Sequence, residues 1–129
     1  MRPIKFRAWC NGEWFDRVLA SQYEDGPCSL VWLDDSKKWV HHDGPICQFT
    51  GLYDSSGEEI YEGDILLQKN GDIGEVRFHK PWGAFYYSCI SGKNDDGETV
   101  TLWGSHPFYN DAHRYTIIGN IYENPELAK

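Results

Sequence analysis

The chain has 129 residues, of which 40% are hydrophobic and 16% are aromatic. This length can bury a hydrophobic core without disulfides or metals, and the aromatic content excludes a disordered chain. The formal net charge is −8, divided into −1 over residues 1–44 and −7 over residues 45–129. Direct binding to a nucleic-acid backbone is therefore not expected, because such binding needs clustered Lys and Arg.

The cysteines and the start of the chain indicate a cellular compartment. No two of the four cysteines, Cys10, Cys28, Cys47 and Cys89, form a C-x-x-C pair. The first residues lead into an alternating strand rather than an apolar leader, and no run approaches the roughly 18 apolar residues of a membrane span. We therefore expect a cytoplasmic protein with reduced, mostly buried thiols.

The first part of the chain predicts paired β-hairpins. Ile4, Phe6 and Ala8 alternate with polar or amphipathic residues, which is typical of a half-buried strand. Asn11-Gly12 is a strong hairpin signal, since both residues accept a positive φ. The expected order is strand 3–9, strand 13–19, a polar loop at 20–27, strand 28–33, a turn at 34–37 and strand 38–41.

The second part predicts a meander of short strands. Its turns are marked by Asp54-Ser55-Ser56-Gly57 and by a second Asn-Gly pair, Asn70-Gly71. No segment carries apolar residues at helical spacing over ten or more positions. The expected fold is all-β: a small antiparallel barrel, or a sandwich, preceded by N-terminal β-hairpins, with little or no helix. Its strands are expected at 46–50, 59–61, 65–69, 73–79, 84–91, 99–103 and 114–122, with an irregular segment at 104–113 and a last turn at 124–127.

Three blocks of the sequence resemble the YopX-like family of phage and prophage proteins. They are Ile4–Trp9, then Gln48–Leu52 with Asp54, Gly57 and Ile60–Ile65, and finally Ile118–Leu127. The resemblance implies one YopX-like domain over residues 1–129, with a hairpin subregion at 1–47 and an SH3-like barrel subregion at 48–127. It implies expression in an infected or lysogenic bacterium, and it carries over no catalytic residue.

Sites for chemistry are weakly indicated. His41, His42, Asp43 and Cys47 lie within seven positions, but their spacing fits no zinc pattern, so no metal or other cofactor is expected. The carboxylates between Asp54 and Asp64 suit turn positions better than catalysis. A pair of Cys47 or Cys89 with a distant histidine stays open as a hydrolase site, although a buried thiol is the simpler interpretation.

Aromatic residues of the second part are the best binding candidates. The predicted patch consists of Trp82, Phe85, Tyr87 and Trp103. Exposed aromatics on SH3-like barrels commonly line a groove for extended peptides, whereas the alternative is a core with an oligomer interface.

The function expected from these features is binding without catalysis. The protein would be a phage or prophage accessory protein that binds a host or phage protein. It would act as a homo-oligomer, through an aromatic patch surrounded by acidic residues. Three alternatives stay open: an acidic decoy of a nucleic-acid-binding host or defence protein, a sponge for a small signalling molecule, and a hydrolase with a Cys/His or carboxylate site.

Overall fold

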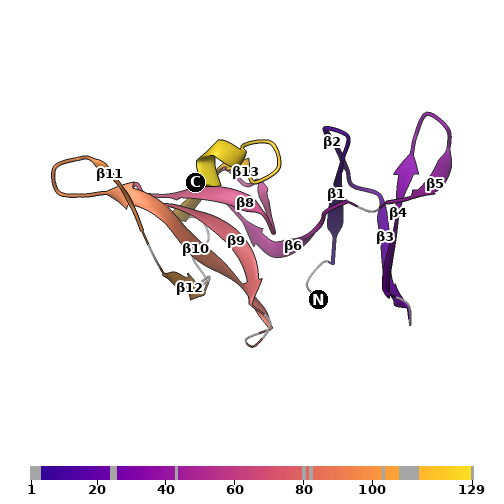
Figure 1. Ribbon diagram of the computed structural model, residues 1–129, viewed down its shortest axis with the longest axis horizontal. Helices are drawn as coiled ribbons and strands as arrows, with labels where there is room; N and C mark the ends of the chain where they lie inside the picture. Colours follow the sequence, from indigo (N-terminus) through magenta and orange to yellow (C-terminus); the bar gives the residue numbers. More distant parts are fainter. Residues whose placement is uncertain are drawn as a thin grey trace. The chain divides into compact units, whose positions relative to one another are not determined.

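The computed structural model describes residues 4–23, 26–42, 44–79, 81, 83–102, 104–107 and 114–128, and for 20–23, 26–29 and 105–107 it describes the backbone. Nearly all elements are antiparallel strands, which confirms the expected all-β class (Figure 1). The chain divides into two compact units, Met1–Phe49 and Thr50–Lys129. The strands are β1 (Phe6–Cys10), β2 (Glu13–Phe15), β3 (Val18–Tyr23), β4 (Gly26–Leu33), β5 (Lys38–His41), β6 (Ile46–Tyr53), β7 (Glu59–Tyr61), β8 (Asp64–Gln68), β9 (Ile73–His79), β10 (Ala84–Lys93), β11 (Thr99–Thr101), β12 (Ser105–Pro107) and β13 (Tyr115–Asn120), and η3 is a short 3-10 helix (Pro125–Ala128).

The first unit is built from hairpins. The turn between β1 and β2 places Asn11 at φ 51° and Gly12 at φ 80°, both positive, as a tight two-residue hairpin requires. β1 also pairs with the start of β6, and β3, β4 and β5 form a separate antiparallel sheet. The side chains with almost no exposed surface in this unit are Ala8, Val31, Cys47 and Phe49.

Strand β3 corrects the sequence-based prediction of a loop at residues 20–27. The chain breaks at Asp16-Arg17 instead, and β3 then pairs with β4 without interruption from Val18 opposite Val31 to Tyr23 opposite Gly26. The ladder to β4 outweighs the polar composition of this segment, because strand propensity depends strongly on the partner strand. An outer strand also tolerates polar residues, and β3 is outermost in its sheet.

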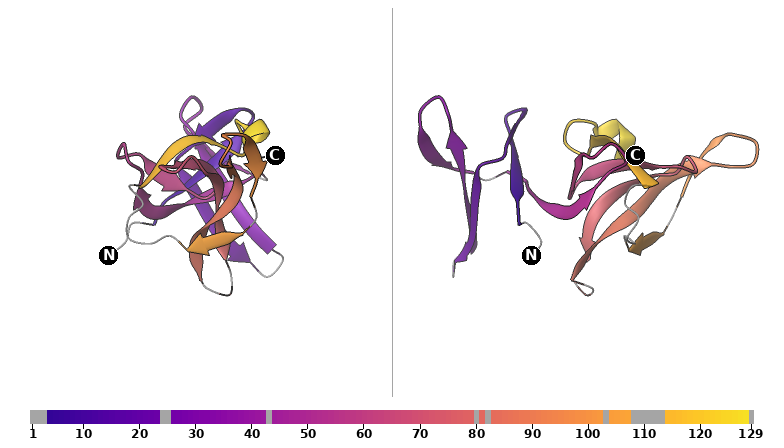
Figure 2. Two further views of the ribbon diagram at one scale, coloured as in Figure 1. Left: turned by 90° about the vertical axis from the view of Figure 1, so that its left-hand side faces the viewer. Right: turned by 180° about the vertical axis from the view of Figure 1, so that it is seen from behind.

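The second unit is organised around one curled antiparallel sheet, half of a barrel. Its strand order is β11-β10-β9-β8-β13. Strand β12 pairs with β10 from Tyr86 to Ser88, before the register shift between Cys89 and Ser91. Figures 1 and 2 show β8, β9 and β10 side by side, with η3 next to β13. The core cluster of this unit consists of Ile60, Leu66, Val76, Phe85, Tyr87 and Tyr115.

Gly74 explains how a tyrosine fits across this sheet. A Cβ at Gly74 would lie 2.5 Å from Cε2 of Tyr87, far inside van der Waals contact. The absent side chain therefore leaves room for the Tyr87 ring, which is fully buried and lies 5.3 Å from the Tyr115 ring. Tyr87 is thus a central packing residue of the second unit.

Candidate functional site

A groove of about 370 Å³ opens in the first unit, and we call it the tryptophan groove. Three segments supply it: strand β2 with the Asp16-Arg17 connection, the end of β4, and the turn that leads to β5. The residues lining it are Glu13, Trp14, Phe15, Asp16, Arg17, Trp32, Leu33, Asp34, Asp35 and Ser36. The Trp32 amide donates to the Arg17 carbonyl oxygen at 3.1 Å, which ties the connection to β4.

The tryptophan groove combines aromatic surface with negative charge. Among the described residues that line it are three aromatic rings, four carboxylates and one guanidinium. The Trp32 Nε1–H donates to Oδ1 of Asp34 at 2.9 Å, which fixes the indole edge beside that carboxylate. The rings are half-buried, whereas Asp34 and Asp35 are exposed. A half-buried ring beside exposed carboxylates offers both apolar contact and charge to a partner.

Arginine side chains lie over both groove tryptophans. The guanidinium carbon of Arg7 lies 4.0 Å from the Trp14 ring centroid, and that of Arg17 lies 5.8 Å from the Trp32 ring centroid. Attraction between a cation and an aromatic face extends to about 6 Å. Arg7 is therefore closely seated on its ring, and the exposed Arg17 lies at the limit of the range.

The sequence did not single out the tryptophan groove. A signal was present, since Glu13-Trp14-Phe15-Asp16 and Trp32-Leu33-Asp34-Asp35 each place a tryptophan two positions before an aspartate at a strand end. Their proximity does not follow from the sequence, which predicts a loop at residues 20–27 where the structure has the β3–β4 hairpin.

Two members of the aromatic patch predicted from the sequence lie in the core. Phe85 is 9% exposed and Tyr87 is fully buried, and both belong to the core cluster of the second unit. Trp82 and Trp103 lie outside the described residues. Phe85 and Tyr87 therefore serve the packing of β10 against β9 and the inner face of the sheet, and binding through Trp82 and Trp103 stays a prediction.

The carboxylate of Asp54 accepts hydrogen bonds from backbone amides. Its Oδ1 accepts hydrogen bonds from the amides of Ser56 and Glu58, each at 2.9 Å, and its Oδ2 accepts one from Ile117 of β13 at 3.0 Å. Burial alone would raise the pKa of Asp54, but these backbone N–H groups lower it on balance. Asp54 thus holds its turn closed and fastens it to β13.

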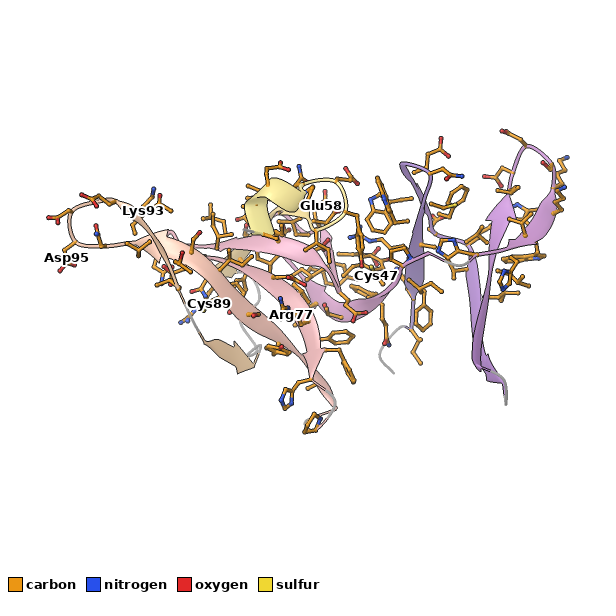
Figure 3. All side chains as sticks on the ribbon, viewed as in Figure 1. Cys47, Glu58, Arg77, Cys89, Lys93 and Asp95 are labelled. Atoms are coloured by element: carbon orange, nitrogen blue, oxygen red, sulfur yellow. The ribbon has the colours of Figure 1, made fainter. Side chains whose placement is uncertain are left out.

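The turn between β10 and β11 repeats the local hydrogen bonds of the Asp54 turn. In the hairpin between β10 and β11, Asn94 Oδ1 accepts from the amides of Asp96 and Glu98 at 3.0 and 2.9 Å. Figure 3 shows Asp95 on the exposed loop of this hairpin and Lys93 at the end of β10. The two turns share the pattern of an Asp or Asn, two residues and then Gly-Glu. Over the described residues, the Asp54 side chain bonds a neighbouring strand, whereas the Asn94 side chain bonds its own loop.

Two other buried polar residues, one in the central block and one in the final block, also bond the backbone. Asp64, 2% exposed, accepts a hydrogen bond from the Tyr61 amide at 2.8 Å. Asn120 Oδ1 accepts from the amides of Tyr122 and Glu123 at 3.1 and 2.9 Å, which closes the turn after β13. Buried carboxylate and amide groups are thus satisfied by the backbone at the points where strands begin or end.

Of the two thiols that the sequence leaves open as nucleophiles, Cys47 is buried and Cys89 is partly exposed. Cys47 is 1% exposed. Burial, with a smaller contribution from the charge of Asp72, raises the pKa of Cys89, so less of this thiol is in the reactive thiolate form at neutral pH. Figure 3 shows Cys89 on β10 and Arg77 on the neighbouring β9, and both line a second groove of about 390 Å³.

The histidine cluster of the sequence is only partly described. Asp43 lies outside the described residues, and His42, 5% exposed, donates from Nε2 to the Pro45 carbonyl oxygen at 3.2 Å. Over the described part of the chain, no three His, Cys, Asp or Glu side chains gather as a metal site would need. Across the same residues, no helix is both long enough and apolar enough to cross a membrane.

The fold and the groove define an all-β protein with a curled half-barrel unit and a hairpin unit that carries an aromatic, acidic groove. The chain belongs to the YopX family, because the sequence model of that family, described as YopX protein, matches residues 5–129. A search of curated proteins gave no match. Among solved structures, the chain is similar to the crystal structure of protein EF1440 from Enterococcus faecalis, with 24% identity, a TM-score of 0.59 and 100% of each chain covered. That similarity shows a shared fold.

Proposed function

We propose that this protein acts by binding, without catalysis, to a macromolecule of a bacterial host or of a phage, and that the tryptophan groove is the contact surface. The observation that carries the proposal is the composition of the groove, where three aromatic rings are set among exposed carboxylates. Tryptophan is the residue type most enriched among those that dominate binding energy, and surrounding charge guides the approach of a partner.

The surroundings of Asp54 and Cys89 support binding over catalysis. The Asp54 carboxylate is occupied by backbone amides, and the pKa of Cys89 is shifted away from the thiolate. A catalytic site is expected to show the opposite, with titratable groups converging on a cleft and pKa values moved toward the working pH.

The biological setting of the proposal comes from the family. YopX-like proteins occur in phages and prophages, so we place this protein as an accessory factor in the cytoplasm of an infected or lysogenic bacterium. A homo-oligomer is part of the proposal, and the edge strand β5, with Trp39 41% exposed, is the described surface that favours it. Sedimentation velocity of the purified chain checks the oligomeric state.

Affinity capture with matched charge variants tests the proposal. The tagged wild-type chain is expressed in the host, and its retained proteins are compared with those of Asp34→Asn/Asp35→Asn and Trp32→Ala. The control is Asp95→Asn/Asp96→Asn, which makes the same chemical change on the exposed β10–β11 loop of the other unit. We expect a partner that wild type and control retain and both groove variants lose. A partner retained equally by all four proteins would contradict the role of the groove.

A further inference from the structure

The tryptophan groove already shows which chemistry its rings accept. Arg7 covers the Trp14 ring at 4.0 Å and Arg17 faces the Trp32 ring at 5.8 Å, so each indole is matched with a guanidinium of the same chain. Trp offers the strongest aromatic face for a cation, and Arg is the cation most often found there. The first unit therefore places tryptophan faces where guanidinium groups are favoured.

The two arginines differ in how firmly they are held. Arg7 lies on β1 and is half-buried, whereas Arg17 lies in the connection between β2 and β3 and is exposed. The backbone of Arg17 is fixed by the hydrogen bond from Trp32, but its guanidinium lies near the outer limit of a favourable cation–aromatic distance. A second guanidinium with closer seating can take the place of this loosely held one.

The charge around Trp32 favours such an exchange. Four carboxylates line the groove against the single guanidinium of Arg17, counted over its described lining. Asp34 is held beside the indole by the Trp32 Nε1–H bond, so a carboxylate and a ring face are presented together. A guanidinium suits this pair better than an ammonium, because it is planar, stacks on indole and bonds a carboxylate with two parallel N–H groups.

Strand β2 indicates the form of the partner. Glu13, Trp14 and Phe15 line the groove, and β2 is the outermost strand beside β1. An extended segment can lie along an outer strand and direct alternate side chains into an adjacent groove.

We propose that the tryptophan groove takes an arginine side chain from an extended segment of a protein partner, and that its guanidinium replaces Arg17 on Trp32 beside Asp34 and Asp35. This inference rests on the proposed binding function and adds the chemistry of the partner. The acidic groove thus selects a basic segment, and Arg17 acts as an internal competitor that lowers the affinity for it.

Two peptides that differ in one charge test the inference. The probes are acetyl-Gly-Gly-Arg-Gly-Gly-amide and the same peptide with citrulline, the neutral isostere of arginine, titrated into the full chain and followed by the indole N–H signals in NMR. We expect the arginine peptide to shift the Trp32 signal and to bind about tenfold tighter than the citrulline peptide, as the loss of a cation–aromatic contact and a charge-assisted bond implies.

Variants of the groove should change the affinity for the arginine peptide in directions opposite to those expected for an anion-binding site. Arg17→Gln should tighten the arginine peptide, Asp34→Asn/Asp35→Asn should weaken it, and Asp95→Asn/Asp96→Asn should leave it unchanged. Equal binding of the two peptides, an unshifted Trp32 signal, or loss of binding in Arg17→Gln would overturn the inference. A captured partner that depends on Trp32, together with equal binding of the two peptides, would leave the proposed function standing and remove only the arginine assignment.

Discussion

The hydrogen bond between Asp54 and the Ile117 amide makes a sharp prediction about the second unit. Asp54→Asn keeps the Oδ1 acceptor that closes the turn, as Asn94 does in the matching turn of the β10–β11 hairpin. It replaces Oδ2, which accepts from Ile117 at 3.0 Å, with an amide NH₂ group that can only donate. The substitution therefore removes this bond to β13, while the bonds of Ser55 to Tyr115 and Thr116 and the turn itself stay intact.

The expected loss is about 2–3 kcal/mol in the free energy of unfolding at pH 7, because a bond to a charged acceptor disappears and the N–H of Ile117 is left facing another donor. The pKa of Asp54 is lowered in the folded protein, so its contribution is present above the ordinary carboxyl pKa and is lost as the pH falls through the folded pKa. The difference between wild type and Asp54→Asn should therefore shrink in acid.

Urea unfolding followed by far-UV circular dichroism between pH 7 and acid measures both effects, and hydrogen exchange at the Ile117 amide measures the local one. The matched control is Asn94→Asp, which adds the same charge to the turn that is not fastened, and it should change stability by less than about 0.5 kcal/mol. The reasoning is refuted by an Asp54→Asn variant as stable as wild type at pH 7, or by unchanged protection of Ile117.

Two further predictions concern packing and thiols. Gly119→Ala should destabilise the second unit by about 1–3 kcal/mol in urea unfolding, because its Cβ would lie 2.8 Å from Cγ of Asn124 and displace an acceptor of the Asn120 amide. Cys47 and Cys89 should be labelled by iodoacetamide much more slowly in the native protein than in urea, measured by peptide mass mapping, because one is buried and the other has a raised pKa. Equal labelling in both states would contradict this.

Turns were predictable from the sequence because a few adjacent residues determine them. Asn11-Gly12 takes the positive φ angles that the pair permits, and Asp54 with Gly57 closes its turn through local bonds, with the amide of Gly57 donating to the Asp54 carbonyl oxygen at 3.1 Å. The all-β class followed from these turns and from the missing helical period.

Partner strands and facing layers were not predictable to the same degree. Strand β3 extends over polar residues only because β4 lies opposite, which no local pattern records. The alternation in β10 puts Phe85 and Tyr87 on one face, but it does not determine whether that face meets solvent or lies in the core with Ile60 of β7. Two of the four residues of the predicted aromatic patch, Phe85 and Tyr87, therefore lie in the core.

The tryptophan groove depends on both kinds of information. Its tryptophans lie 18 positions apart in the sequence, and the β3–β4 hairpin brings the second to the connection that follows the first. Charge and aromatic content could be counted from the sequence, but their meeting in one groove depends on the pairing of Val18 with Val31. A binding site made from separate hairpins is thus visible only after the pairing is known.

The affinity of a captured partner for groove variants tests the central claim most directly. Titration calorimetry of the purified partner with wild type, Trp32→Ala, Asp34→Asn/Asp35→Asn and the control Asp95→Asn/Asp96→Asn gives four dissociation constants. We predict that both groove variants bind about tenfold more weakly or worse, as truncation of a dominant contact implies, and that the control binds like wild type. Equal dissociation constants for all four proteins would contradict the account.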